Sequence, residues 1–254
     1  MQMPVNPLKR ALRDGAQQIG LWNMLSSHLA VEVVAGAGFD FLVLDMEHAP
    51  NELPMVHGQL QAMASGSAAP VVRPPWNDPV TFKRLLDLGV QNFVVPVVQD
   101  ADEARRAVAA TRYPPQGIRG VAVATRANRY GRVTDYLQRA NEEICVHVQL
   151  ETGTALANLE SIAAVDGVDG LFIGPSDLAA DLGHLGDSAH PEVRAAIDDA
   201  IVRIRKAGKA PGILAPVEAD ARHWLALGAT FVAVGSDLGV LARQTEVLAN
   251  KFKP

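Results

Sequence analysis

Four short apolar runs of the sequence each end in charged or polar side chains. In chain order these are Asp45, Glu47 and His48 after Phe41–Leu44, Arg73 after Val71–Val72, Gln149 and Glu151 after Val146–Val148, and Ser176 and Asp177 after Leu171–Ile173. Carboxylates supply metal ligands, an imidazole transfers protons near neutral pH, and a guanidinium stabilises negative charge. The set therefore predicts metal-assisted acid–base chemistry, if the fold brings the four segments together.

The carboxylates of Glu151 and Asp177 are the predicted metal ligands. Two oxygen donors without a histidine at the same strand ends suit a hard divalent cation, Mg²⁺ or Mn²⁺, with Co²⁺ as a further candidate. A tightly held zinc ion would favour several His or Cys ligands. The segment from Gly174 to Asp177 also enters a helix, whose free N–H groups form a site for a substrate carboxylate.

His48 is the predicted acid–base group. Asp45 lies three residues before it, close enough for the carboxylate to orient the imidazole if the loop turns. Arg73 would stabilise the negative charge that grows on a keto oxygen as an enolate forms.

Each of these residues also has a purely structural interpretation. A carboxylate after a strand is often a helix N-cap, as Ser176 or Asp177 would be for a helix beginning near Leu178. The carboxylate pair could be neutralised by Arg73 without any metal. His147 shares a strand face with Glu151, but an interior structural role is favoured for it. Four strands that end in this way together favour a functional site.

The elements that must position these residues alternate along the chain. The predicted strands are Gln18–Trp22, Phe39–Leu44, Ala69–Arg73, Asn92–Val97, Ile144–Leu150, Gly170–Ile173, Pro211–Leu214 and Thr230–Val234. Predicted helices between and after them include Val80–Leu88, Ala101–Thr111, Pro191–Ala207, Val217–Leu227 and Leu238–Phe252. Alternating strands and helices imply a parallel sheet, because each return to the sheet needs a crossover.

Eight such units in 254 residues, without a linker, predict a single domain over residues 1–254, a (β/α)8 TIM barrel. An open doubly wound sheet is the alternative, but no G-x-G-x-x-G follows the first strand. Catalytic groups of such barrels lie at the C-terminal strand ends, where the four polar segments fall. The long insertion Tyr113–Asn141 is predicted to be an active-site loop followed by a helix.

Composition narrows the class of protein. Hydrophobic residues make up 48% and charged residues 20% of the chain, as in ordinary globular proteins, and no apolar stretch or signal-like N-terminus indicates a membrane or export. A net charge of −5 without a basic cluster argues against nucleic acid as a partner. The single cysteine, Cys145, fits a reducing cytoplasm.

Several motifs together resemble the HpcH/HpaI aldolases over nearly the whole chain. They are Leu44-Asp45-Met46-Glu47-His48-Ala49-Pro50-Asn51, Val72-Arg73-Pro74-Pro75-Trp76, Tyr113-Pro114-Pro115-Gln116-Gly117-Ile118-Arg119-Gly120, Gln149-Leu150-Glu151-Thr152 and Phe172-Ile173-Gly174-Pro175-Ser176-Asp177-Leu178. The resemblance implies a barrel of the phosphoenolpyruvate/pyruvate superfamily and a class II aldolase. The substrates of such an aldolase would be a 2-oxo acid, either pyruvate or hydroxypyruvate, and an aldehyde.

The resemblance also implies roles for individual residues. Glu151 and Asp177 would bind the metal, His48 paired with Asp45 would transfer protons, and Arg73 would contact the keto oxygen. The pyruvate portion would be held by Gln149 and the backbone of Ser176 and Asp177, with Trp22 and Leu214 lining the pocket. It further implies a homo-oligomer, often a hexamer, in which Leu238–Phe252 is exchanged between subunits.

Two departures and three rival functions stay open at this level. Met46 stands where many relatives carry glycine, and Ser176 where many carry alanine, and both lie beside the predicted pocket. A Schiff-base aldolase is disfavoured because none of the lysines ends a predicted strand. An acyl-CoA lyase of the citrate-lyase-like branch would favour more basic residues. A barrel that only binds a 2-oxo acid would not require the acid–base pair, so substrate turnover separates it from an enzyme.

Overall fold

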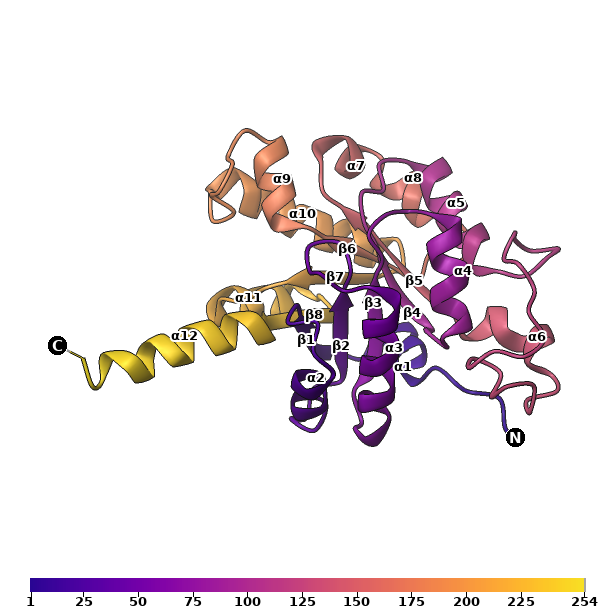
Figure 1. The fold of residues 1–254 in the computed structure, drawn as a ribbon. Helices are drawn as coiled ribbons and strands as arrows, with labels where there is room; N and C mark the ends of the chain where they lie inside the picture. Colours follow the sequence, from indigo (N-terminus) through magenta and orange to yellow (C-terminus); the bar gives the residue numbers. More distant parts are fainter. Residues whose placement is uncertain (254) are drawn as a thin grey trace.

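A closed barrel of eight parallel strands forms the centre of the molecule in the computed structural model, which describes residues 1–253 (Figure 1). The strands are β1 (Gln18–Asn23), β2 (Phe41–Asp45), β3 (Ala69–Arg73), β4 (Asn92–Val95), β5 (Cys145–Leu150), β6 (Gly170–Ile173), β7 (Ala210–Leu214) and β8 (Phe231–Ser236). Each strand pairs with the next along the chain, and β1 closes the barrel against β8. The predicted (β/α)8 barrel is confirmed.

The helices lie around the outside of the barrel. They are α1 (Pro7–Arg13), α2 (His28–Ala35), α3 (Leu53–Ala62), α4 (Pro79–Asp87), α5 (Ala101–Thr111), α6 (Tyr136–Arg139), α7 (Gly153–Ala157), α8 (Leu159–Ala163), α9 (Pro175–Asp181), α10 (Pro191–Lys206), α11 (Glu218–Leu227) and α12 (Asp237–Asn250), with short 3-10 turns at Met63–Ser65 and Ala140–Glu143. Side-chain caps fix several starts: Asp78 accepts the N–H of Thr81, and Asp100 that of Glu103. Among the described residues, no helix is long and apolar enough to cross a membrane.

Aromatic side chains fill the inside of the barrel. The rings of Phe41 and Phe231 stack 4.0 Å apart, and His147 stacks on Phe231 at 4.6 Å. Space for the Phe41 ring exists only because Gly20 has no side chain, since a Cβ there would lie 2.3 Å from the ring. His147 is therefore an interior residue below the mouth of the barrel, as the favoured interpretation of the sequence held.

The end of β4 differs from the prediction. The strand stops at Val95 rather than Val97, because Val97 has a φ of 53° and leaves the extended conformation. A positive φ is costly for a β-branched residue and is commonly found at functional sites. Here the turn aims the N–H of Val97 at the carboxylate of Glu151.

The insertion Tyr113–Asn141 is not an active-site loop of its own barrel, contrary to the prediction. It joins α5 to β5 and therefore lies at the N-terminal end of the strands, opposite the predicted catalytic end. Its backbone pairs with the end of α4, with the N–H of Ala127 donating to Asp87, and the guanidinium of Arg126 donates to the carbonyl of Leu88. The segment contains the predicted helix, α6.

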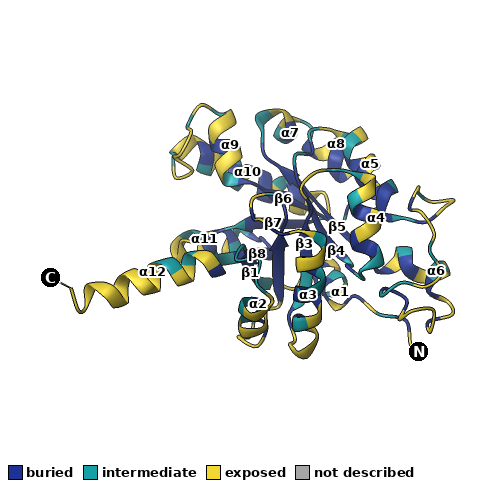
Figure 2. Ribbon diagram, in the orientation of Figure 1, coloured by how far each residue is buried: buried dark blue, intermediate teal, exposed yellow. Residues whose placement is uncertain are grey.

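The last helix, α12, extends away from the barrel (Figure 1). Most of its length is exposed (Figure 2). Asp237, at its first position, is the one buried residue among those of α12 that the structure describes.

Candidate active site

The predicted site residues come together at the C-terminal ends of the strands. A cavity of about 310 Å³ is lined by Trp22, Met24, His48, Arg73, Gln149, Phe172, Gly174, Pro175, Ser176, Asp177 and Leu214. An adjoining cavity of about 330 Å³ is lined by Glu47, His48, Val97, Glu151, Thr152, Asp177 and Asp181. His48 and Asp177 border both cavities, so they form one continuous mouth. Asp45 is the one predicted residue outside this lining, and it is buried directly beneath.

Asp45 holds Arg73 in place. Its two carboxylate oxygens accept hydrogen bonds from Nε and an Nη of Arg73 at 2.9 and 2.6 Å, and the indole N–H of Trp22 adds a third at 3.1 Å. Burial alone would raise the pKa of Asp45, but the hydrogen bonds and positive charge of Arg73 outweigh it and lower the pKa. Asp45 is therefore an ionised carboxylate that fixes the guanidinium at the base of the cavity.

The loop after β2 does not bring the carboxylate of Asp45 against the imidazole of His48, as the sequence predicted. Asp45 instead accepts the backbone N–H groups of Glu47 and His48, at 3.0 and 3.4 Å. The loop after β2 thus wraps around the carboxylate while the His48 side chain projects into the mouth, 59% exposed. Asp45 positions His48 through its backbone.

Glu47 is a site residue to which the sequence interpretation gave no role. Its carboxylate lies 2.8 Å from the second Nη of Arg73 and 3.9 Å from Nε2 of His48. Burial raises the pKa of Glu47, against the opposing charge of Arg73. The position of Glu47 in the sequence, between Asp45 and His48 at the end of the same strand, could have indicated that it belongs to the site.

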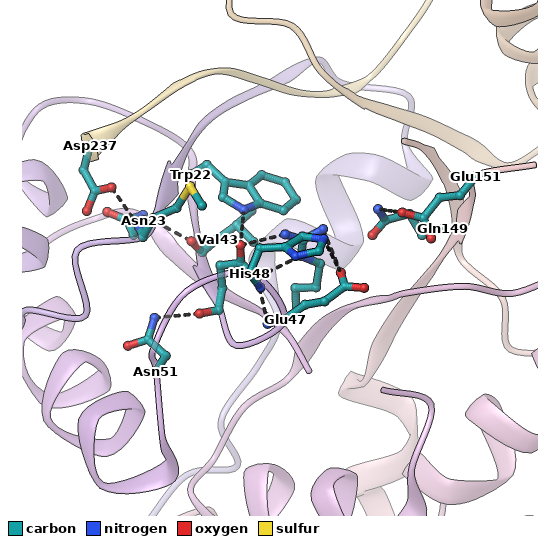
Figure 3. Close-up of polar contacts among 12 residues, drawn as sticks. Trp22, Asn23, Val43, Glu47, His48, Asn51, Gln149, Glu151 and Asp237 are labelled. Carbon is teal, nitrogen blue, oxygen red and sulfur yellow. Dashed lines mark hydrogen bonds and ion pairs between the residues drawn. The ribbon is translucent and has the colours of Figure 1, made fainter. Parts of the chain in front are cut away.

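Glu151 lies across the mouth from Glu47 and His48, next to Gln149 (Figure 3). Its two oxygens accept hydrogen bonds from Nε2 of Gln149 at 2.5 Å and from the N–H of Val97 at 2.8 Å. Burial raises the pKa of Glu151 to about 7, and the negative charges of Glu47 and Asp177 add to the rise.

The approach of β6 to this carboxylate depends on a glycine. A Cβ at Gly174 would lie 2.7 Å from Cγ and 2.9 Å from Oε1 of Glu151. The Gly174–Pro175 turn then starts α9, which carries Ser176 and Asp177 to the rim of the cavity.

The mouth is an oxygen-rich site with unbalanced charge. Burial is the main cause of the raised pKa values of Glu47 and Glu151, and repulsion from neighbouring carboxylates, Asp177 among them, adds to both; the single charge of Arg73 is already shared between Asp45 and Glu47. A divalent cation between Glu151 and Asp177 would offset this repulsion, and carboxylate oxygens are the donors that Mg²⁺ and Mn²⁺ prefer. The residues present therefore fit the predicted metal.

Comparison with known proteins agrees with the fold and the motifs. A family model described as HpcH/HpaI aldolase/citrate lyase matches residues 18–244. A Salmonella dublin protein called 4-hydroxy-2-oxo-heptane-1,7-dioate aldolase is 59% identical over 248 residues, 97% of this chain and 94% of that protein. The structure of an HpcH/HpaI aldolase/citrate lyase family protein from Burkholderia cenocepacia J2315 matches with a TM-score of 0.94 and 42% identity, over 97% of this chain and 99% of that one. The citrate synthase SbnG matches at 0.86 and 27%, over 96% of both chains.

The closed barrel and these similarities define the class of the protein, a carbon–carbon lyase built on a (β/α)8 barrel. The chain belongs to the HpcH/HpaI aldolase/citrate lyase family. The resemblance that the motifs indicated is thereby confirmed.

Proposed function

We propose that this chain is a class II aldolase that forms and cleaves 4-hydroxy-2-oxo acids through the enolate of pyruvate or hydroxypyruvate. One observation carries the proposal: Arg73, fixed by the buried Asp45, faces a cavity whose rim also holds His48 and the carboxylates of Glu151 and Asp177. An enolate needs this combination, because its formation moves a proton and leaves negative charge on an oxygen.

Glu151 and Asp177 would hold a divalent metal ion, Mg²⁺ or Mn²⁺, with Co²⁺ as a further candidate. When bound, the ion would act as a Lewis acid toward the oxygens of the 2-oxo acid. Gln149 orients Glu151 through its 2.5 Å hydrogen bond and would also reach the substrate. Ser176 and Asp177 border the same cavity, and their backbone N–H groups would bind the substrate carboxylate.

Arg73 and His48 would carry the chemical step. The guanidinium is held on one side by Asp45 and on the other by Glu47, so it can stabilise an enolate oxygen without first reorganising. His48 is exposed at the mouth and would remove the C3 proton of the 2-oxo acid, directly or through a water molecule. In the cleavage direction the 4-hydroxyl loses its proton, the C3–C4 bond breaks, and the enolate regains a proton at C3.

The relatives' name suggests the substrate. Cleavage of 4-hydroxy-2-oxoheptanedioate between C3 and C4 gives pyruvate from C1 to C3 and a four-carbon aldehyde acid from C4 to C7. Trp22 and Leu214 form apolar walls of the cavity and would pack against the carbon chain. We propose this compound as a substrate, and a cytoplasmic location for the enzyme.

The C-terminal helix supports a homo-oligomer, and we propose the hexamer with exchanged helices that the family resemblance implies. Apolar side chains on and after α12 are strongly exposed in the isolated chain: Leu238, Val240, Leu241, Val247, Leu248 and Phe252 are between 45% and 81% exposed. A contiguous apolar face of this kind is typical of a subunit interface. Light scattering during gel filtration would measure the assembly, and a monomer would contradict this part of the proposal.

The activity is tested by following pyruvate released from 4-hydroxy-2-oxoheptanedioate with a coupled lactate dehydrogenase. We expect turnover that needs Mg²⁺ or Mn²⁺, is abolished by EDTA, and falls by at least about a hundredfold in Arg73→Lys, which cannot make the paired contacts to Asp45 and Glu47. Binding of the compound without turnover under all metals would favour the non-catalytic barrel.

A further inference from the structure

Two histidines from the loop that joins α9 to α10 and a glutamate from the first turn of α10 converge outside the active site; Figure 1 shows where this loop lies. His184, His190 and Glu192 each offer one ligand atom, and these atoms all lie within 4.8 Å of one another. Nε2 of His184 lies 2.8 Å from a carboxylate oxygen of Glu192, and the two imidazole rings stack 3.5 Å apart. Among the described residues, three side chains able to bind a metal gather in this way only here.

Hydrogen bonds fix the backbone around the three side chains. Gly183 takes a φ of 86°, which lets the N–H of His184 donate to the carbonyl of Ala179 near the end of α9. His190 is the N-cap of α10, and its Nδ1 accepts the N–H of Glu192 at 3.3 Å. The loop between them is closed by the N–H of His190 donating to Asp187. The ligands are therefore presented by two helix ends, not by a free tail.

We propose that His184, His190 and Glu192 form a second metal site, selective for zinc-like transition metals and distinct from the catalytic carboxylate pair. Two imidazoles and one carboxylate are the donors that Zn²⁺, Ni²⁺ and Co²⁺ prefer, with water in a remaining position. Tetrahedral ligands about 2.0–2.2 Å from Zn²⁺ lie roughly 3.3 Å from one another. The three atoms lie within 4.8 Å of one another, one pair of them at 2.8 Å, and the two stacked, nearly parallel imidazole rings must turn about their side-chain torsions to point at a common ion.

The metal would bridge the end of α9 to the start of α10. Because the first turn of α9 carries Ser176 and Asp177 at the active-site rim, the bridge holds the element that positions a catalytic carboxylate. The two sites differ in donor chemistry, so Mg²⁺ would load Glu151 and Asp177 without loading the histidines.

The test separates the two sites by substitution. In a Glu151→Gln/Asp177→Asn background, which removes the proposed catalytic ligands, equilibrium dialysis with Zn²⁺ is expected to show one ion bound per chain. Adding His190→Asn should weaken binding by at least tenfold, while asparagine still caps α10. His184→Gln should have the same effect without touching the cap. His223→Gln is the matched control, because His223 also pairs with a carboxylate, that of Asp198, but belongs to no group of three metal-binding side chains in the part of the chain that the structure describes.

Spectroscopy and stability give independent readouts. Co²⁺ bound in the same background should show the visible absorption of an imidazole-ligated ion, lost in His190→Asn. In the unaltered protein loaded with Mg²⁺, Zn²⁺ at about 100 times its Kd should raise Tm by about 5 °C or more, and His190→Asn should lose that rise. The proposal is overturned if the background variant binds no Zn²⁺ saturably. It is also overturned if binding survives both His184→Gln and His190→Asn.

Discussion

Proton competition at Glu151 gives the sharpest prediction about the metal site. In the metal-free protein, burial raises the pKa of Glu151 to about 7, and the charges of Glu47 and Asp177 add to the rise. The carboxylate must lose its proton before it can bind a cation. Metal affinity should therefore be nearly full at pH 8 and above, and be lost as the pH falls through 7.

The size of the effect follows from that pKa. At pH 8 about nine-tenths of the Glu151 side chains are ionised and at pH 6 about one-tenth, so the apparent Kd for Mn²⁺ should rise about tenfold between them, or about 1.4 kcal/mol. Calorimetry in two buffers of different ionisation enthalpy measures both the Kd and the protons released. We expect about 0.9 proton released per ion at pH 6 and about 0.1 at pH 8.

Glu47→Gln is the matched control. It removes one of the negative charges that raise the pKa of Glu151 while nearly keeping the side-chain shape, so the loss of affinity should shift to lower pH. An equal Kd at pH 6 and pH 8 in the unaltered protein would refute the reasoning, since Glu151 would then be ionised throughout.

Three further substitutions test other parts of the structure. Asp45→Asn removes one of the two carboxylates that pair with the buried guanidinium of Arg73, the other being Glu47, and should lower the free energy of unfolding by about 3 kcal/mol in urea titrations; a loss under 1 kcal/mol would contradict the buried pair. Burial lowers the pKa of His147 to about 3, below its unfolded value, so its neutral form stabilises the fold at neutral pH and that stability is lost as the pH falls below about 6.5, at about 1.4 kcal/mol per pH unit. His147→Phe should keep the stack and flatten the stability profile between pH 7 and 5; an unchanged slope would refute this. Gly174→Ala should push Glu151 aside and weaken Mn²⁺ binding at least tenfold with little loss of Tm, whereas unchanged affinity would contradict the close approach.

Much of the barrel was predictable from local patterns. The strands β3 and β6 and the helix α5 have the predicted bounds, because apolar runs between turn residues and an Asp100 cap leave little choice. The clustering of the polar segments was also predictable, since parallel strands of a barrel all present their C-terminal ends at one face.

The incorrect predictions concern backbone turns and the choice of side-chain partners, which depend on contacts distant in the sequence. A spacing of three residues between Asp45 and His48 does not show which atoms meet, and the buried guanidinium of Arg73 takes both carboxylate oxygens. The left-handed turn at Val97 comes with the hydrogen bond from its N–H to the carboxylate of Glu151, a contact that no local propensity of valine indicates. The turn-rich composition of the insertion after α5 does not specify an end of the barrel; its place between α5 and the next strand does, and it puts the segment at the N-terminal end rather than at the active site.

The central claim, enolate formation at the site of Arg73, His48 and the carboxylate pair, is tested most directly by deuterium exchange. NMR of pyruvate in D₂O follows replacement of its C3 protons and needs no assumption about the aldehyde. We expect exchange with Mn²⁺ or Mg²⁺, none with EDTA, and loss in both His48→Ala and Asp177→Ala. Exchange that persists in His48→Ala and Asp177→Ala, or no exchange of pyruvate or hydroxypyruvate with any of these metals, would contradict the mechanism.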